Sequence, residues 1–64
     1  MNYYIYAVSE LDLSNIQHVA SKDTAASAIA HAQKLLNQWR QVGRAPYRYV
    51  VRYNPTNELV ASVP

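Results

Sequence analysis

The fold is decided by residues 23–43, DTAASAIAHAQKLLNQWRQVG, because this stretch predicts the one helix of the chain. Its apolar residues recur with the 3.6-residue period that gathers them on one face of a helix. The apolar stripe consists of Ala25, Ala28, Ile29, Ala32, Leu35, Leu36, Trp39 and Val42. We therefore expect an amphipathic helix from Asp23 to Val42, which packs this stripe against the rest of the chain.

The residues beside this stretch suit the two ends of a helix. Ser21 and Asp23 are both favoured N-cap residues, whose side-chain oxygen accepts a hydrogen bond from a free backbone N–H. Gly43 is the only glycine in the chain and stands where a residue with positive φ commonly follows a helix. Pro46 then prevents the helix from resuming, because proline has no backbone N–H. We expect the helix to stop just before Gly43.

Two strands are predicted ahead of the helix. Residues 3–8, YYIYAV, are apolar on both faces, which is typical of a central strand that is covered on both sides. Residues 16–20 predict a shorter, weaker strand. The faces of the first strand carry Tyr3, Ile5 and Ala7 on one side and Tyr4, Tyr6 and Val8 on the other. The sequence leaves open which of these two faces meets the helix.

A hairpin is predicted after the helix. Its first strand, 47–53, turns Tyr47, Tyr49, Val51 and Tyr53 to one face and Arg48, Val50 and Arg52 to the other. Its second strand, 58–63, has Leu59, Ala61 and Val63 on its apolar side. Between the strands, residues 54–57, NPTN, suit a type I turn that starts at Asn54, with Asn57 in the left-handed conformation.

This turn predicts a bulged three-residue loop and a definite register. The loop pairs Tyr53 with Leu59, Val51 with Ala61 and Tyr49 with Val63, so that the apolar faces of both strands coincide. A symmetric loop would instead pair Tyr53 with Glu58 and set the apolar faces against each other, because side chains alternate with a period of two. Pattern and turn chemistry both favour the bulged loop.

Together these elements predict an α+β fold in the order ββαββ. One amphipathic helix packs on a small, mainly antiparallel four-stranded sheet, and residues 1–64 make a single domain. The strand order 2-1-3-4 would place the doubly apolar first strand inside the sheet.

The short chain needs reinforcement. A domain of this length buries only about 60% of its unfolded surface, and disulfides, a metal or oligomerisation commonly compensate. The sequence has no cysteine, and its two histidines, His18 and His31, are a poor basis for a metal site. We expect no metal and no cofactor, and we expect a homodimer, with a well-packed monomer as the alternative.

The composition also indicates in which compartment the protein is expected. Half of the residues are apolar and 16% are charged, as in a folded domain. The first residues lack the basic segment and long apolar core of a signal peptide, and the apolar runs are too short to span a membrane. We expect a cytoplasmic protein that does not bind membranes.

The charges are distributed unevenly. The net charge is +2, and all four arginines lie within residues 40–52. Two of them, Arg48 and Arg52, share the face of the predicted hairpin that points away from the helix, with Val50 and Val60 between them. One face of the first strand should lie beside them, either Tyr4, Tyr6 and Val8 or Tyr3, Ile5 and Ala7. This outward face of the sheet is the candidate binding surface.

Three interpretations of that surface remain open. Tyrosine and arginine are enriched in protein interfaces, so the face can bind a second copy or a foreign protein, with Arg48, Arg52, Arg44, Arg40, Tyr4 and Tyr6 as the candidate residues. Arginines beside aromatic rings can also bind nucleic acid, through Arg40, Arg44, Arg48 and Arg52. In the third interpretation the two outward arginines only solvate the face.

No catalytic motif accompanies this surface. The serines are scattered, and a single glycine cannot form a phosphate-binding loop. We therefore expect a non-enzymatic binding protein that acts through protein–protein interaction, with nucleic-acid binding as the alternative. Its size suits the small accessory or inhibitor proteins of phages and mobile elements.

Overall fold

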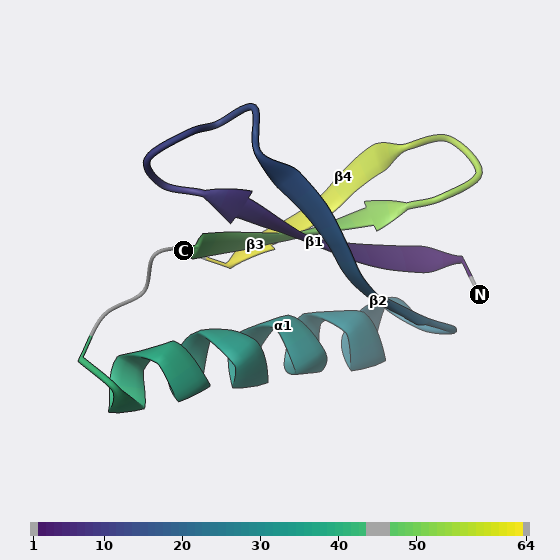
Figure 1. Cartoon of the computed structure of the whole chain (residues 1–64). Helices are drawn as coiled ribbons and strands as arrows, with labels where there is room; N and C mark the ends of the chain where they lie inside the picture. Colours follow the sequence, from purple (N-terminus) through teal and green to yellow (C-terminus); the bar gives the residue numbers. More distant parts are fainter. Residues whose placement is uncertain (1, 44–46, 64) are drawn as a thin grey trace.

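The computed structural model describes residues 2–43 and 47–63. Its elements are β1 (Tyr3–Ser9), β2 (Ile16–Lys22), α1 (Ala25–Gln41), β3 (Tyr47–Tyr53) and β4 (Glu58–Val63). The strands form one antiparallel sheet in the order β2-β1-β3-β4, and α1 lies across one face of it (Figure 1). The predicted α+β fold, its ββαββ order and the inner position of β1 are confirmed.

The core lies between α1 and the sheet. It consists of Ile5, Ala7, Ala28, Ala32, Leu36, Tyr49, Val51 and Val63. Ile5 and Ala7 are therefore on the face of β1 that meets α1, which resolves the choice that the sequence left open. Two of the three core residues of the helix, Ala28 and Ala32, are small, whereas all core residues of the sheet except Ala7 are larger, which suits close packing of the two layers.

The N-cap of the helix lies one residue after Asp23 and three residues after Ser21, the two predicted caps. Its N-cap is Thr24, whose side chain accepts a hydrogen bond of 3.1 Å from the backbone N–H of Ser27. The prediction of Ser21 or Asp23 was wrong. One reason is that β2 continues to Lys22, two residues beyond the predicted strand, so Ser21 belongs to the sheet.

The helix α1 ends just before Gly43, as predicted. This residue has a φ of +87°, and its backbone N–H donates a 3.1 Å hydrogen bond to the carbonyl of Arg40. Val42 is the C-cap and is 68% exposed, so it does not belong to the buried stripe as predicted. Pro46, which was predicted to prevent the helix from resuming, lies outside the described part of the chain.

The β3–β4 hairpin corrects the predicted turn. The turn starts at Tyr53, whose carbonyl accepts hydrogen bonds from the N–H groups of Thr56 at 3.3 Å and Asn57 at 2.7 Å. Asn57 has the predicted left-handed conformation, with φ at 60°. Tyr53 nevertheless pairs with Glu58, not with Leu59 as expected.

A bulge inside β4 shifts the pairing by one residue, so that beyond it the two strands have the predicted register. Val51 pairs with Ala61 as predicted, while Arg52 pairs with Leu59, which leaves Val60 as the extra residue. Leu59 consequently shares the face of Arg52, away from α1, and the prediction that it joins the apolar side was wrong. A similar bulge in β2 leaves Val19 unpaired between Ala20, opposite Ile5, and His18, opposite Tyr6.

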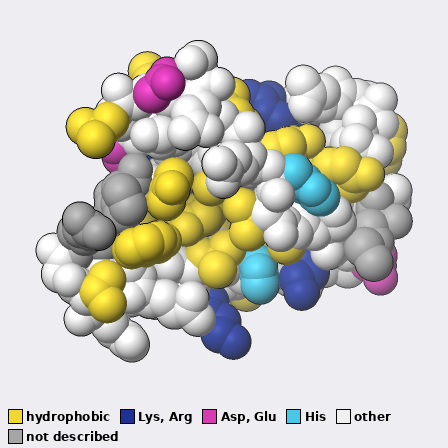
Figure 2. Space-filling model, in the orientation of Figure 1, with side chains coloured by type: hydrophobic (Ala, Val, Ile, Leu, Met, Phe, Trp, Pro, Cys, Tyr) yellow, Lys and Arg dark blue, Asp and Glu magenta, His cyan; other side chains and the backbone are white. Residues whose placement is uncertain are grey.

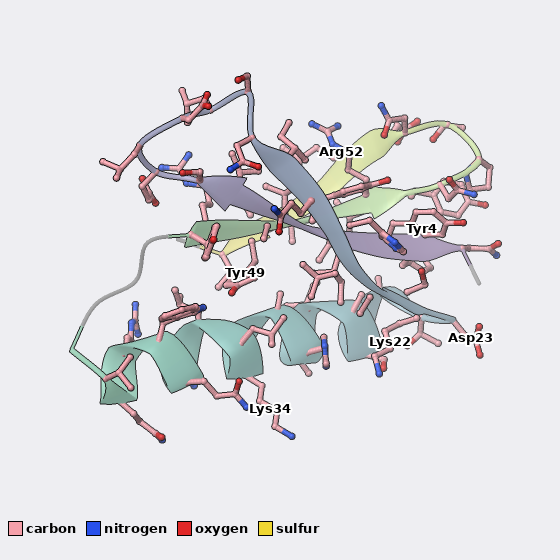
Figure 3. The ribbon with its side chains drawn as sticks, in the orientation of Figure 1. Tyr4, Lys22, Asp23, Lys34, Tyr49 and Arg52 are labelled. Carbon is pink, nitrogen blue, oxygen red and sulfur yellow. The ribbon has the colours of Figure 1, made fainter. Side chains whose placement is uncertain are left out.

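Trp39 joins the helix to the sheet. Its indole Nε1 donates a 2.9 Å hydrogen bond to the hydroxyl of Tyr49, which points from β3 toward α1 (Figure 3). The Trp39 ring also lies 5.9 Å, centroid to centroid, from the ring of Tyr47. This contact ties the C-terminal half of α1 to β3, consistent with the expected packing role of Trp39.

Candidate functional site

The face of the sheet that points away from α1 is the candidate functional site, and we call it the outer face. No described element of the chain covers it (Figure 1). The pairing of the strands assigns to this face Tyr4, Tyr6, Val8, Ile16, His18, Ser21, Arg48, Val50, Arg52, Leu59 and Ser62. The Cα atoms span only 14 Å in the thinnest direction, which is the depth of one sheet and one helix.

The middle of the outer face is apolar. A hollow of about 470 Å³ is lined by Tyr6, Val8, Ile16, Val50, Arg52 and Asn57. Ile16 and Leu59 are 55% and 56% exposed. Water therefore contacts aliphatic side chains from all four strands, which is costly unless another molecule covers them.

Both charged residues on the outer face are arginines. Arg48 and Arg52 are four residues apart on β3, a separation of about 13 Å along the strand. Arg48 is exposed, and Arg52 is half-buried and donates a 3.0 Å hydrogen bond from Nη1 to the carbonyl of Asn57. Figure 3 shows Arg52 on the side of the sheet opposite α1. The hydrogen bond holds this guanidinium beside the hollow.

The carboxylates lie elsewhere in the described residues. Glu10 and Asp12 are in the loop between β1 and β2, and Asp23 precedes α1. Glu58 is opposite Tyr53, whose ring lies 5.3 Å, centroid to centroid, from that of Tyr3 on the helix side of the sheet. The outer-face positions therefore combine apolar, aromatic and cationic side chains.

Three aromatic rings cluster at one side of the outer face. The His18 ring lies 4.8 Å from that of Tyr4 and 5.6 Å from that of Tyr6, between centroids. His18 Nε2 and the hydroxyl of Ser21 are 2.9 Å apart and share a hydrogen bond. This contact brings a hydroxyl beside a base.

The loop between β1 and β2 exposes two leucines beside this face. Leu11 is 97% and Leu13 is 71% exposed. The loop is held by its own hydrogen bonds: the carboxylate of Asp12 accepts from the Ser14 hydroxyl at 2.6 Å and from its N–H at 3.1 Å. These bonds lower the pKa of Asp12, because they favour the charged carboxylate.

The structure brings together only some of the predicted binding residues. Tyr4, Tyr6, Arg48 and Arg52 share the outer face. Arg40 is on α1, across the sheet from them, and Arg44 is outside the described residues. Leu59 lies opposite Arg52, and Val60, which was expected on this face, is the extra residue of the bulge. Sequence reasoning also missed the contributions of Ile16 and His18, because their face depends on the bulge at Val19.

Other sites are less developed. Hydrophobic side chains also reach the surface between α1 and the sheet (Figure 2), where Leu35, Trp39 and Tyr47 border the core. Within residues 2–43 and 47–63, no three histidine, aspartate or glutamate side chains gather as metal ligands. No helix in the same residues has the length and apolar character needed to cross a membrane.

No family model, curated protein or solved structure matches the chain.

Proposed function

We propose that this protein is a non-enzymatic binding protein that uses its outer face to hold a protein partner. The observation that carries the proposal is the exposed apolar centre of that face, flanked by tyrosine and arginine. Interfaces of stable complexes have this composition, with aromatic residues and arginine contributing most of the affinity. Ile16 and Leu59, each more than half exposed, would gain most from being covered.

A second candidate is nucleic-acid binding, which the cationic charge of the face favours. Arg48 and Arg52 can contact two phosphates, whereas Arg40 lies across the sheet. Two phosphate contacts give a slope of about −2 for log K against log salt. A mainly apolar protein interface responds far less to salt, so a salt titration separates the candidates.

Charge reversal on the outer face tests the proposed function. Arg48→Glu combined with Arg52→Glu should leave the fold intact, because neither side chain belongs to the core. The double variant should fail to retain, from a lysate of the native host, a protein that the wild type retains. Lys34→Glu is the control, because Lys34 is exposed on α1 and points away from the sheet (Figure 3).

The control variant should retain the same partner as the wild type. Circular dichroism of all three proteins checks that the fold survives. Equal retention by the wild type and the double variant would contradict a binding role for the outer face.

A further inference from the structure

We propose that the occupant of the outer face is an acidic amphipathic helix of another protein. The inference rests on the proposed function and names the chemistry of the partner. Such a helix would form the third layer of a sandwich, with α1 on one face of the sheet and the bound helix on the other. Its apolar stripe would fill the hollow lined by Tyr6, Val8, Ile16 and Val50.

Charge complementarity requires the occupant to be acidic. Arg48 and Arg52 flank Val50, and no strand position on the same face carries a carboxylate; Glu10 and Asp12 are in the loop between β1 and β2. A protein surface that supplies carboxylates would therefore compensate the two positive charges that it covers. The half-buried Arg52 is already oriented by its bond to Asn57, which reduces the entropy lost when it binds a carboxylate.

The spacing of the arginines predicts the spacing of the acids. A separation of about 13 Å along β3 corresponds to roughly nine residues of an α-helix, at about 1.5 Å per residue. Acids seven or eight positions apart would lie about 10–12 Å apart, which two long arginine side chains can still reach. Residues about seven or eight positions apart lie on the same side of a helix. A helix that runs along β3 should therefore carry aspartate or glutamate at about this interval, beside its apolar stripe.

The face is less suited to a second copy of the chain. A two-fold dimer uses the same patch on both subunits, so the arginines of one copy would meet a face that is also cationic. Like charges brought together in an interface oppose association.

The face is also less suited to nucleic acid. Val8, Ile16, Val50 and Leu59 are aliphatic and offer no ring on which a base can stack. The rings of Tyr4 and Tyr6 already contact His18. The whole chain has a net charge of only +2.

Strand addition at the sheet edges is disfavoured as well. The edge strands are β2 and β4, and each is interrupted by a bulge, at Val19 and Val60. Bulges break the row of free backbone groups to which an added strand would pair. The partner should therefore lie across the face instead of extending the sheet.

Selection from a displayed library of random helical peptides tests this inference. The full chain is the target, and the enriched peptides should combine an apolar stripe with acids about seven or eight residues apart. Arg48→Glu should weaken a selected peptide about tenfold, because attraction becomes repulsion. Lys34→Glu, with the same change of charge on an exposed helical position, should leave its affinity within about twofold. Val50→Asp should abolish binding.

Other outcomes separate this inference from the proposed function. Enriched peptides that lack acids yet lose binding in Val50→Asp would overturn the acidic helix and leave the outer face as a protein-binding surface. Two results would overturn both the acidic helix and the proposed function: enrichment of no peptide, or peptides that bind Arg48→Glu and Val50→Asp as well as they bind the wild type. Tighter binding of single-stranded oligothymidine than of any peptide would identify nucleic acid as the occupant. If the wild type sediments as a dimer at micromolar concentration, and Arg48→Glu alters its dimerisation, the occupant of the outer face is a second copy of the chain.

Discussion

The backbone at Gly43 has a conformation that few residues other than glycine adopt. Its φ of +87° is in the left-handed region, and a Cβ built at this position would meet no atom within 4 Å. Replacement therefore causes no steric clash with the rest of the described chain. The cost of a side chain at Gly43 comes from the backbone conformation alone, which asparagine tolerates and β-branched residues do not.

Substitution of Gly43 should thus separate residues by their backbone preference. Gly43→Val should lower the free energy of unfolding by about 1–2 kcal/mol, a large share for a domain of this size. Gly43→Asn should be milder. Thermal melts measure the order, since 1 kcal/mol corresponds to roughly 4–8 °C in a small domain. Equal melting temperatures for both variants and the wild type would show that the left-handed backbone contributes nothing to stability.

The bulges in β2 and β4 decide which side chains of these two strands reach the outer face. Val60 is the extra residue of β4, and because of it Leu59 lies opposite Arg52 while Ala61 still lies opposite Val51. Removal of Val60 would leave a regular ladder in which every one of these pairs persists. Removal of a neighbouring paired residue would instead move the end of β4 to the other face.

Single deletions in β4 should reveal this difference. Deletion of Val60 should change the free energy of unfolding by less than about 1 kcal/mol, because only a partly exposed side chain is lost. Deletion of Ser62 should cost about 1.5–3 kcal/mol, because Val63 leaves the core for the outer face. Urea unfolding measures both. A larger loss for the Val60 deletion would mean that the bulge itself stabilises the hairpin.

The bulges also explain what the sequence could and could not predict. The helix, its end at Gly43 and the pairing of Val51 with Ala61 follow from periodicity and turn chemistry, and each is confirmed. One extra residue in the hairpin was also correctly inferred from the mismatch of the two apolar patterns. Its location was not, because an extra residue in the loop and one at Val60 satisfy the same pattern downstream.

The candidate site was predictable where the strands are regular. The unbroken alternation of β3 placed Arg48 and Arg52 on the outer face, whereas the sequence left open whether the face of β1 with Tyr4 and Tyr6 lies beside them. The residues contributed by the edge strands were missed, because a bulge reverses the face of every position beyond it and has no sequence signature of its own. Thr24 was missed as the N-cap for a different reason: three neighbouring residues can all cap a helix.

For the whole molecule, stability depends on how closely one helix approaches one sheet. Ala28 and Ala32 are fully buried in the same cluster as Ile5 and Val51. Their small side chains allow α1 to lie near the sheet, where Leu36 and Trp39 complete the contact. With only two layers, a change in this spacing affects the entire core.

A larger side chain at the layer boundary should therefore destabilise the protein. Ala32→Leu should lower the free energy of unfolding by about 1–3 kcal/mol, because the added atoms overpack a filled core. Ala30→Leu is the matched control: Ala30 is exposed on the same helix, and its variant should stay within about 0.5 kcal/mol of wild type. Similar stabilities for the two variants would indicate unfilled space beneath α1.

Because Trp39 is hydrogen-bonded to Tyr49, its fluorescence reports whether α1 is packed against β3. Trp39 is the only tryptophan, so indole emission arises from one place, where α1 meets β3. Far-ultraviolet circular dichroism records the helix regardless of what it contacts. When the two signals change together during unfolding, the layers separate as the helix melts; if emission changes first, α1 detaches while still helical.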